Sequence, residues 1–381
     1  MPVSLGKRAQ RDGVVDLRGR RLFLHGSAAL GLVACGASRA ATLADTADVD
    51  ADTKAWLAES LTIDMHSHAG RVIISRNATR GASRPFVPLA APMREGGMNV
   101  ICLAIVADTE TTRVSADRKR FEAYRAPAPG ELYAHAQAAF ARAAALIADQ
   151  GLQVITTAAG LRAARTGGPA VIVAAEGADF LEGRLDRVDE AYQRHGLRHL
   201  QLVHYRVNEL GDIQTEPPVH GGLSDFGADV VRRCNALGIV VDVAHGTLDL
   251  VKRAAAATRK PLLLSHTSLV DRPGPRSRQI SAEHARVVAS TGGVVGVWPS
   301  AGAFADLDAM AAGARRMAEV VGVDHVGLGS DMLGFITPPV FNSYRQLPQY
   351  ANALVAAGFT RVEVAKVLGG NAARVFEATL G

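Results

Sequence analysis

The feature that most constrains the fold of this chain is a regular alternation of short apolar runs with longer helical patterns. The helical patterns include residues 130–150, 225–238 and 281–292. Continuous apolar strands that alternate with helices are typical of a parallel sheet covered on both faces. Eight such strands predict an α/β fold, a (β/α)8 TIM-type barrel. The eight apolar runs are residues 61–68, 99–106, 170–177, 200–204, 239–245, 261–266, 292–298 and 325–331.

A doubly wound nucleotide-binding fold is the main rival, and the glycine pattern argues against it. Such a fold needs a glycine-rich turn of the form G-x-G-x-x-G after an early strand. The nearest stretch, GLGSDMLG at residues 327–334, does not fit that spacing and follows the last strand. The sequence also lacks a Walker A pattern and a G-x-S-x-G elbow. Two long connections, residues 107–129 and 205–224, are expected to form the rim of an active site.

Ionisable residues gather at the predicted carboxyl ends of the strands, which form the active face of such a barrel. Strand alternation places His66 and His68 on the same side of the first strand. Five of the twelve histidines lie at strand ends, and only the second and seventh strands are expected to lack an ionisable terminus. The sequence therefore predicts a metal site on this face. The strand-end residues are His66, His68, Glu176, His204, His245, His266 and Asp331.

These residue types fit a hydrolytic centre with two divalent ions. Imidazole and carboxylate suit zinc and similar metals, and two ions about 3.5–4 Å apart can share one hydroxide. Glu176 is the only strand-end glutamate and could bridge the ions, while Asp331 suits the acid/base that moves protons to the leaving group. Two alternatives remain open at this point: Asp331 could be a metal ligand, and His204 could be structural. His220, in the long fourth connection, could also face the substrate.

The N-terminus has the layout of an export signal. A basic region leads into a short apolar stretch and then into small residues. Arg20 and Arg21 resemble a twin-arginine signal, and the stretch that ends at Cys35 resembles a lipobox, in which the cysteine is lipidated. The alternative is cleavage near residues 37–41, with Cys35 discarded. We therefore expect an exported protein, periplasmic or lipid-anchored at the cell envelope, with a signal at residues 1–34, a tether at 35–56 and a single barrel domain at 57–381.

Charge and cysteine content exclude several other classes of function. The chain has 42 basic and 37 acidic residues, but residues 1–40 alone hold seven basic and two acidic ones. The remainder is therefore balanced at 35 of each, so nothing favours a nucleic-acid partner. No apolar run reaches the length of a membrane helix. Cys102 and Cys234 lie in apolar, regular segments and are expected to be buried thiols.

From Leu57 to the C-terminus the sequence resembles the renal, or membrane, dipeptidases, a branch of the metal-dependent amidohydrolase-like barrels. The resemblance depends on several motifs that occur in the family's order, and together they are specific. The motifs are IDMHSH (63–68), AAEGADFL (174–181), LVHYRVNELGD (202–212), GLSDFGADVVRRCNALGIVVDVAH (222–245), PLLLSHTS (261–268), VGLGSD (326–331) and VLGGNAARVF (367–376).

The resemblance implies a zinc-dependent dipeptidase that hydrolyses dipeptides with a hydroxide bridging two metal ions. It implies that the pairs His66/His68 and His245/His266 each hold one ion, that Glu176 bridges them, and that Asp331 is the proton shuttle. His204 would contact the scissile carbonyl or the developing oxyanion. Arg278 would receive the substrate's terminal carboxylate, with Arg276 as the alternative. A homodimer is left open, and a lipid anchor would be the only membrane contact.

Two departures from the family pattern bear on metal and substrate. The family carries His-x-Asp where this chain has His66 and His68, so the site has one negative charge fewer. It also carries Asp-Phe-Asp-Gly where this chain has Asp331-Met332-Leu333-Gly334. The alternative functions are hydrolysis of a lactam, an N-acyl amino acid or a phosphoester, and an inactive metal-binding protein. Loss of catalysis would predict loss of Glu176 or Asp331, and both are present.

Overall fold

The computed structural model describes residues 51–74 and 84–381. The predicted signal, Cys35 and most of the predicted tether lie outside these residues. No helix in the described part is both long enough and apolar enough to cross a membrane. Cys102 and Cys234 are buried free thiols, as the sequence predicts.

Eight parallel strands close into a barrel in the described part of the chain, which confirms the predicted fold class. Strand β1 pairs with β2 and β11, and β2 pairs with β6, so the order of neighbours returns to its start. A short strand, β5 (Gln153–Val154), pairs with β6 outside the ring. The barrel strands are β1 (Ile63–Ser67), β2 (Val100–Val106), β6 (Ala170–Glu176), β7 (His199–Gln201), β8 (Val240–Asp242), β9 (Leu263–Thr267), β10 (Val294–Val297) and β11 (Val326–Leu328).

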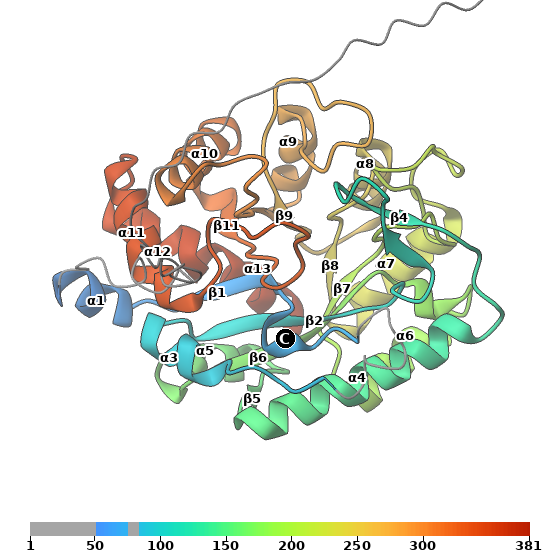
Figure 1. The fold of residues 1–381 in the computed structure, drawn as a ribbon, viewed down its shortest axis with the longest axis horizontal. Coiled ribbons are helices and arrows are strands. Elements are labelled where there is room, and N and C mark those ends of the chain that lie inside the picture. Colours follow the sequence, from blue (N-terminus) through green and yellow to red (C-terminus); the bar gives the residue numbers. More distant parts are fainter. Residues whose placement is uncertain (1–50, 75–83) are drawn as a thin grey trace, which may run out of the picture. The chain divides into compact units, whose positions relative to one another are not determined.

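Helices connect the strands and surround the barrel (Figure 1). Several begin where a Ser, Thr or Asp side chain accepts a hydrogen bond from a backbone N–H of the first turn, as Ser224 does for α7 and Ser281 for α9. The connecting helices are α3 (Ala90–Gly96), α4 (Glu131–Gln150), α5 (Ala158–Gly167), α6 (Asp186–His195), α7 (Asp225–Leu237), α8 (Leu248–Ala257), α9 (Ala282–Ser290) and α10 (Leu307–Val321). Single turns lie at η1 (Ala69–Arg71), η2 (Asp179–Leu181), η3 (Val323–His325), η4 (Tyr344–Gln346) and η5 (Lys366–Gly370).

The remaining helices are α1 (Ala51–Ala58), α11 (Leu347–Ala356), α12 (Arg361–Ala365) and α13 (Asn371–Leu380). The last residues of the predicted tether belong to α1, where the Thr53 hydroxyl donates to Asn352 Oδ1 of α11 over 2.7 Å. Helix α13 closes the amino end of the barrel, because Val375 and Phe376 pack in one buried cluster with the starts of the strands, including Ile63.

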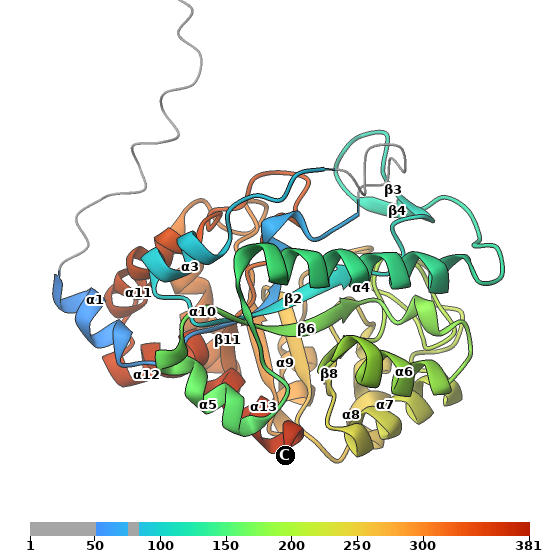
Figure 2. The same ribbon diagram turned by 90° about the horizontal axis from the view of Figure 1, so that it is seen from below.

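The opposite end of the barrel carries a hairpin inserted after β2. Strands β3 (Thr112–Val114) and β4 (Phe121–Ala123) pair antiparallel within the long connection 107–129. Figure 2 shows this hairpin on the side of the barrel away from α13. The carboxyl ends of the barrel strands therefore open toward the hairpin, and the functional residues must be sought there.

Candidate metal centre

Glu176, the last residue of β6, lies at the centre of four buried histidines. Its Oε1 is 3.4 Å from Nε2 of His66, 3.3 Å from Nε2 of His245 and 3.5 Å from Nε2 of His266. Its Oε2 is 3.2 Å from Nε2 of His68. The histidines form two pairs, since the Nε2 atoms lie 3.2 Å apart in His66/His68 and 3.0 Å apart in His245/His266. The structure thus brings the five predicted ligands together as two groups that share Glu176.

The chemistry of these donors fits divalent metal ions. Burial lowers the pKa of His245 and of His266 well below the usual range, so both imidazoles are neutral and can offer a lone pair. The Nδ1–H of His68 donates to the carbonyl of Ala104 over 2.8 Å, which turns Nε2 toward the site. The set contains nitrogen and oxygen atoms without a thiolate, as zinc-type hydrolytic sites do.

The carboxylates of the site require a nearby positive charge. Burial opposes the charge on His68, but hydrogen bonds to Asp331 and Glu176 raise its pKa to about 10. Burial also works against the charge on Glu176, but the charges of His204 and His66 lower its pKa well below the usual range. A proton on His68 thus stabilises the buried carboxylates beside it. Metal ions at the same positions would serve the same electrostatic purpose.

His204 is oriented by a carboxylate that the sequence analysis did not include. Its Nδ1–H donates to Asp108 Oδ1 over 2.8 Å, and its Nε2 lies 3.2 Å from Glu176 Oε2. Asp108 also accepts the backbone N–H of Tyr205. The expectation that the second strand lacks an ionisable terminus is therefore wrong, because Asp108 follows the end of β2 by two residues. A search extended two residues past each apolar run would have found it.

Asp331 is held beside the first histidine pair by an unusual backbone conformation. It lies three residues after β11 with a φ of 46°, and its N–H donates to the carbonyl of His66 over 2.9 Å. Its Oδ1 is 3.4 Å from Nε2 of His68. Among the described residues Asp331 belongs to neither group of candidate ligands. This position suits a proton carrier next to the metal ligands.

A second carboxylate, Asp64, fixes this arrangement from inside the barrel. Asp64 accepts the N–H of Ser330 over 2.8 Å, the hydroxyl of Tyr344 over 2.7 Å and the N–H of His66 over 3.2 Å. Complete burial raises the pKa of Asp64, although these hydrogen bonds oppose the increase. Asp64 thus ties the strand that carries His66 to the segment that carries Asp331.

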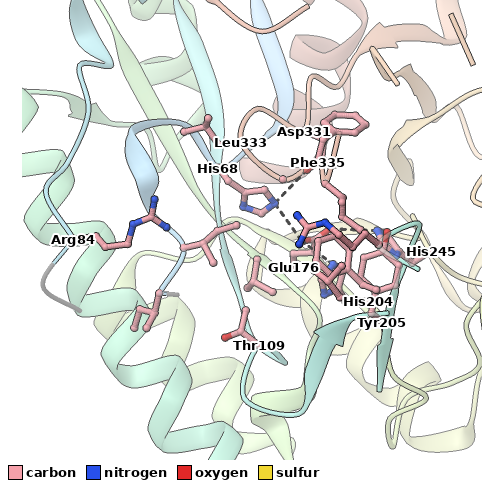
Figure 3. Close-up of a pocket in the computed structure, with 18 residues that line it drawn as sticks. His68, Arg84, Thr109, Glu176, His204, Tyr205, His245, Asp331, Leu333 and Phe335 are labelled. Carbon is pink, nitrogen blue, oxygen red and sulfur yellow. Dashed lines mark ion pairs between the residues drawn. The ribbon is translucent and has the colours of Figure 1, made fainter. Parts of the chain in front are cut away.

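Two adjoining cavities lie above these groups. The proximal cavity, of about 340 Å³, has the metal-ligand candidates His68, Glu176 and His245 in its lining (Figure 3). The distal cavity, of about 330 Å³, is lined by residues that include Arg278, Arg276 and Trp298. Both cavities share a boundary made by Phe121, Tyr205, Asp331, Gly334, Phe335 and Ile336.

Arg278 is the better placed of the two candidate arginines. Its Nη1 donates to Gln214 Oε1, and its guanidinium carbon lies 5.5 Å from the centre of the Trp298 ring. Its Nε and Nη2 are buried and have no hydrogen-bond partner among the described residues. Arg276 is exposed. His220 does not line either cavity, and its Nε2 instead bonds to the carbonyl of Asn208.

The sequence matches a family model described as "Membrane dipeptidase (Peptidase family M19)" over residues 54–380. The chain belongs to this family. The match covers the whole barrel and confirms the resemblance drawn from the motifs. The histidine and glutamate groups described above could hold metal ions in a member of this family.

Individual proteins are similar to this chain over part of its sequence or in their fold. The chain is 30% identical over 193 residues to the dipeptidase aclJ of Aspergillus oryzae. The aligned region covers 48% of this chain and 46% of that protein. The matched regions span about half the length of the first curated relatives. Among solved structures, a metallo peptidase from Rhodobacter sphaeroides, liganded with a phosphinate mimic of the dipeptide L-Ala-D-Ala, has a TM-score of 0.72. That match is 21% identical and covers 84% of this chain and 99% of the other.

The probable dipeptidase PvdM from Pseudomonas aeruginosa has a TM-score of 0.69 at 16% identity. This match covers 86% of the present chain and 98% of the other. At these identities, the two structural matches establish the shared barrel fold.

Proposed function

We propose that the protein is a zinc-dependent dipeptidase that hydrolyses the peptide bond of dipeptides. The observation that carries the proposal is the joining of two buried histidine pairs by Glu176 beneath a cavity that leads to Arg278. Membership of a dipeptidase family supports it, as does the printed name of the Aspergillus oryzae relative. The small paired cavities also suit a substrate of two residues.

The two metal ions would be held by the histidine pairs, with Glu176 between them. Bound there, divalent ions would polarise the peptide carbonyl and lower the pKa of the attacking water toward neutrality. The ligand positions are set by the strands themselves, since His66 lies within β1, His266 within β9 and Glu176 at the end of β6. Rigid strand ends favour a constant geometry through the reaction.

Three further side chains have defined tasks in this proposal. Asp331 accepts a proton from the attacking water and passes it to the leaving amine, as its position beside His68 allows. His204, oriented by Asp108, turns Nε2 toward the reaction centre and stabilises the charge that develops on the carbonyl oxygen. Arg278 receives the terminal carboxylate with its two unpartnered nitrogens.

A substrate panel on zinc-reconstituted protein tests the proposal. We expect turnover of unblocked dipeptides to exceed that of lactams, N-acyl amino acids and phosphoesters, and Glu176→Ala to abolish it. The panel includes a dipeptide with an amidated C-terminus, which should be a poor substrate. Preferred turnover of one of the other three classes would replace the dipeptidase assignment with a different amidohydrolase activity.

We also propose that the protein is exported through the pathway for folded proteins. The support is Arg20 and Arg21 ahead of a short apolar stretch, in residues outside the described part. Replacing both arginines with lysine should leave the precursor in the cytoplasm, measured by fractionation against the unaltered chain. Unchanged export would refute this route. Intact-mass analysis of the mature N-terminus distinguishes a lipidated Cys35 from cleavage beyond it.

A further inference from the structure

Under the proposed function, the two cavities would divide a bound dipeptide between them. Three candidate metal ligands, His68, Glu176 and His245, line the proximal cavity, whereas no candidate ligand lines the distal one within the described residues. The scissile bond must therefore lie on the floor of the proximal cavity. If Arg278 receives the terminal carboxylate, as proposed above, the carboxyl-terminal residue would extend past Tyr205 into the distal cavity. The amino-terminal residue, with its side chain, stays in the proximal cavity.

The proximal cavity carries two arginines that nothing described neutralises. Arg84 and Arg118 line it, and neither guanidinium forms an ion pair with another residue of the described part. The acidic residues in the same lining are Glu176 and Asp331, and both already contact His68. The cavity thus has an excess of positive charge, which two bound metal ions would increase.

Two neighbouring arginines on the same hairpin, by contrast, have acidic partners. Arg113 and Arg120 lie on the same hairpin as Arg118, and both pair with Glu122. Arg120 also pairs with Asp117. The hairpin therefore neutralises the arginines that lie outside the proximal cavity and leaves Arg118 inside it without an acidic partner.

The path from the metal ligands to these arginines is apolar. The side chains of Ile73, Val106, Val114 and Leu333 line the cavity together with the arginines. Figure 3 shows Arg84 across the cavity from His245 and Tyr205. A side chain that fits this lining has an aliphatic stem and an anionic end.

We propose that the enzyme selects dipeptides whose amino-terminal residue is acidic, with glutamate favoured, and that Arg84 and Arg118 bind its side-chain carboxylate. This inference depends on the proposed dipeptidase function. Because both arginines are exposed, solvent screens the contact. We expect a preference of about tenfold, within the range of a charge-assisted hydrogen bond. The contact exists before and during the reaction, so it should lower KM more than it raises kcat.

The test compares glutamyl-alanine with its neutral isostere glutaminyl-alanine on the zinc-loaded enzyme. We expect kcat/KM to favour the glutamyl substrate about tenfold at low salt and less in 0.5 M NaCl, since salt screens exposed charges. In the double variant Arg84→Ala/Arg118→Ala the ratio should fall to about two or less. Arg113→Ala is the matched control, because Arg113 lies on the same hairpin outside the cavity, and it should keep the ratio of the unaltered enzyme.

Two further arms separate the possible failures. Alanyl-glutamate and alanyl-glutamine place the charge at the other residue, and a preference found only there would overturn the proposal in favour of the distal cavity. Hydrolysis of all four substrates without a preference would also overturn it while leaving the dipeptidase function intact. If none is hydrolysed, the proposed function fails. In that case, calorimetry measures the binding of glutamyl-alanine and of glutaminyl-alanine to the zinc-loaded Asp331→Asn protein. Equal binding of the two dipeptides, or no binding, would refute the acidic subsite.

Discussion

Replacing Arg278 with alanine should abolish the distinction between free and blocked carboxyl termini. Gln214 holds Nη1 of Arg278, and the ring of Trp298 lies beside the guanidinium, so Nε and Nη2 are positioned for a ligand. A hydrogen bond to a charged group contributes about 1.5–3 kcal/mol. Two such bonds, partly offset by the cost of desolvating the guanidinium and the carboxylate, amount to about 3 kcal/mol. At 1.36 kcal/mol per factor of ten, the loss in kcat/KM is roughly 100- to 200-fold.

The assay measures kcat/KM for alanyl-alanine and for its C-terminal amide, with metal content determined on the same samples. The amide has no carboxylate to lose, so Arg278→Ala should change its turnover by less than about threefold. Arg276→Ala is the control, since Arg276 lies two residues away on the same segment but is exposed. Equal losses on both substrates would refute carboxylate recognition by Arg278. A selective loss in Arg276→Ala would move that role to Arg276.

Three other perturbations test the centre and the barrel around it. Asp331→Asn should lower kcat by about 10²–10⁴-fold with metal content unchanged, and a lost ion would instead make Asp331 a ligand. Elemental analysis should give about two ions per chain, with one or fewer in Glu176→Ala, and an unchanged count would refute the bridge. Burial lowers the pKa of His284 from 6.5 to about 4, so the native state should lose stability as pH falls from 6.5 toward 4, by about 2 kcal/mol at pH 5. In urea unfolding, the His284→Leu protein should not show this loss of stability at low pH. An identical pH dependence of stability in both proteins would refute the role of His284.

Local sequence determined the barrel and the set of candidate metal ligands. Each strand is a short apolar run followed by a helical pattern. This alternation is a local property, which can be recognised from residues that are close together in the sequence. A parallel barrel places every strand's carboxyl end on one face, so polar residues at the ends of different runs must converge. His66, Glu176 and His266 could therefore be assigned to one centre although they are far apart in the chain.

Contacts between loops were decided by the tertiary structure. Asp108 and His204 are 96 residues apart, and their hydrogen bond forms only because the path of the chain after β2 brings Asp108 to the end of β7. The spacing of residues left the choice between Arg276 and Arg278 open, whereas burial and the contact with Gln214 distinguish them.

The division of the active face into two cavities has the same origin. Phe121 from the inserted hairpin and Tyr205 from the fourth connection meet with Asp331 at the boundary, and their rings lie 5.0 Å apart. A strand's direction follows from its own periodicity, but the course of a long loop depends on the side chains that it meets. The sequence by itself therefore determined which residues form the candidate metal centre, and only the tertiary structure decided which residues line the two cavities above it.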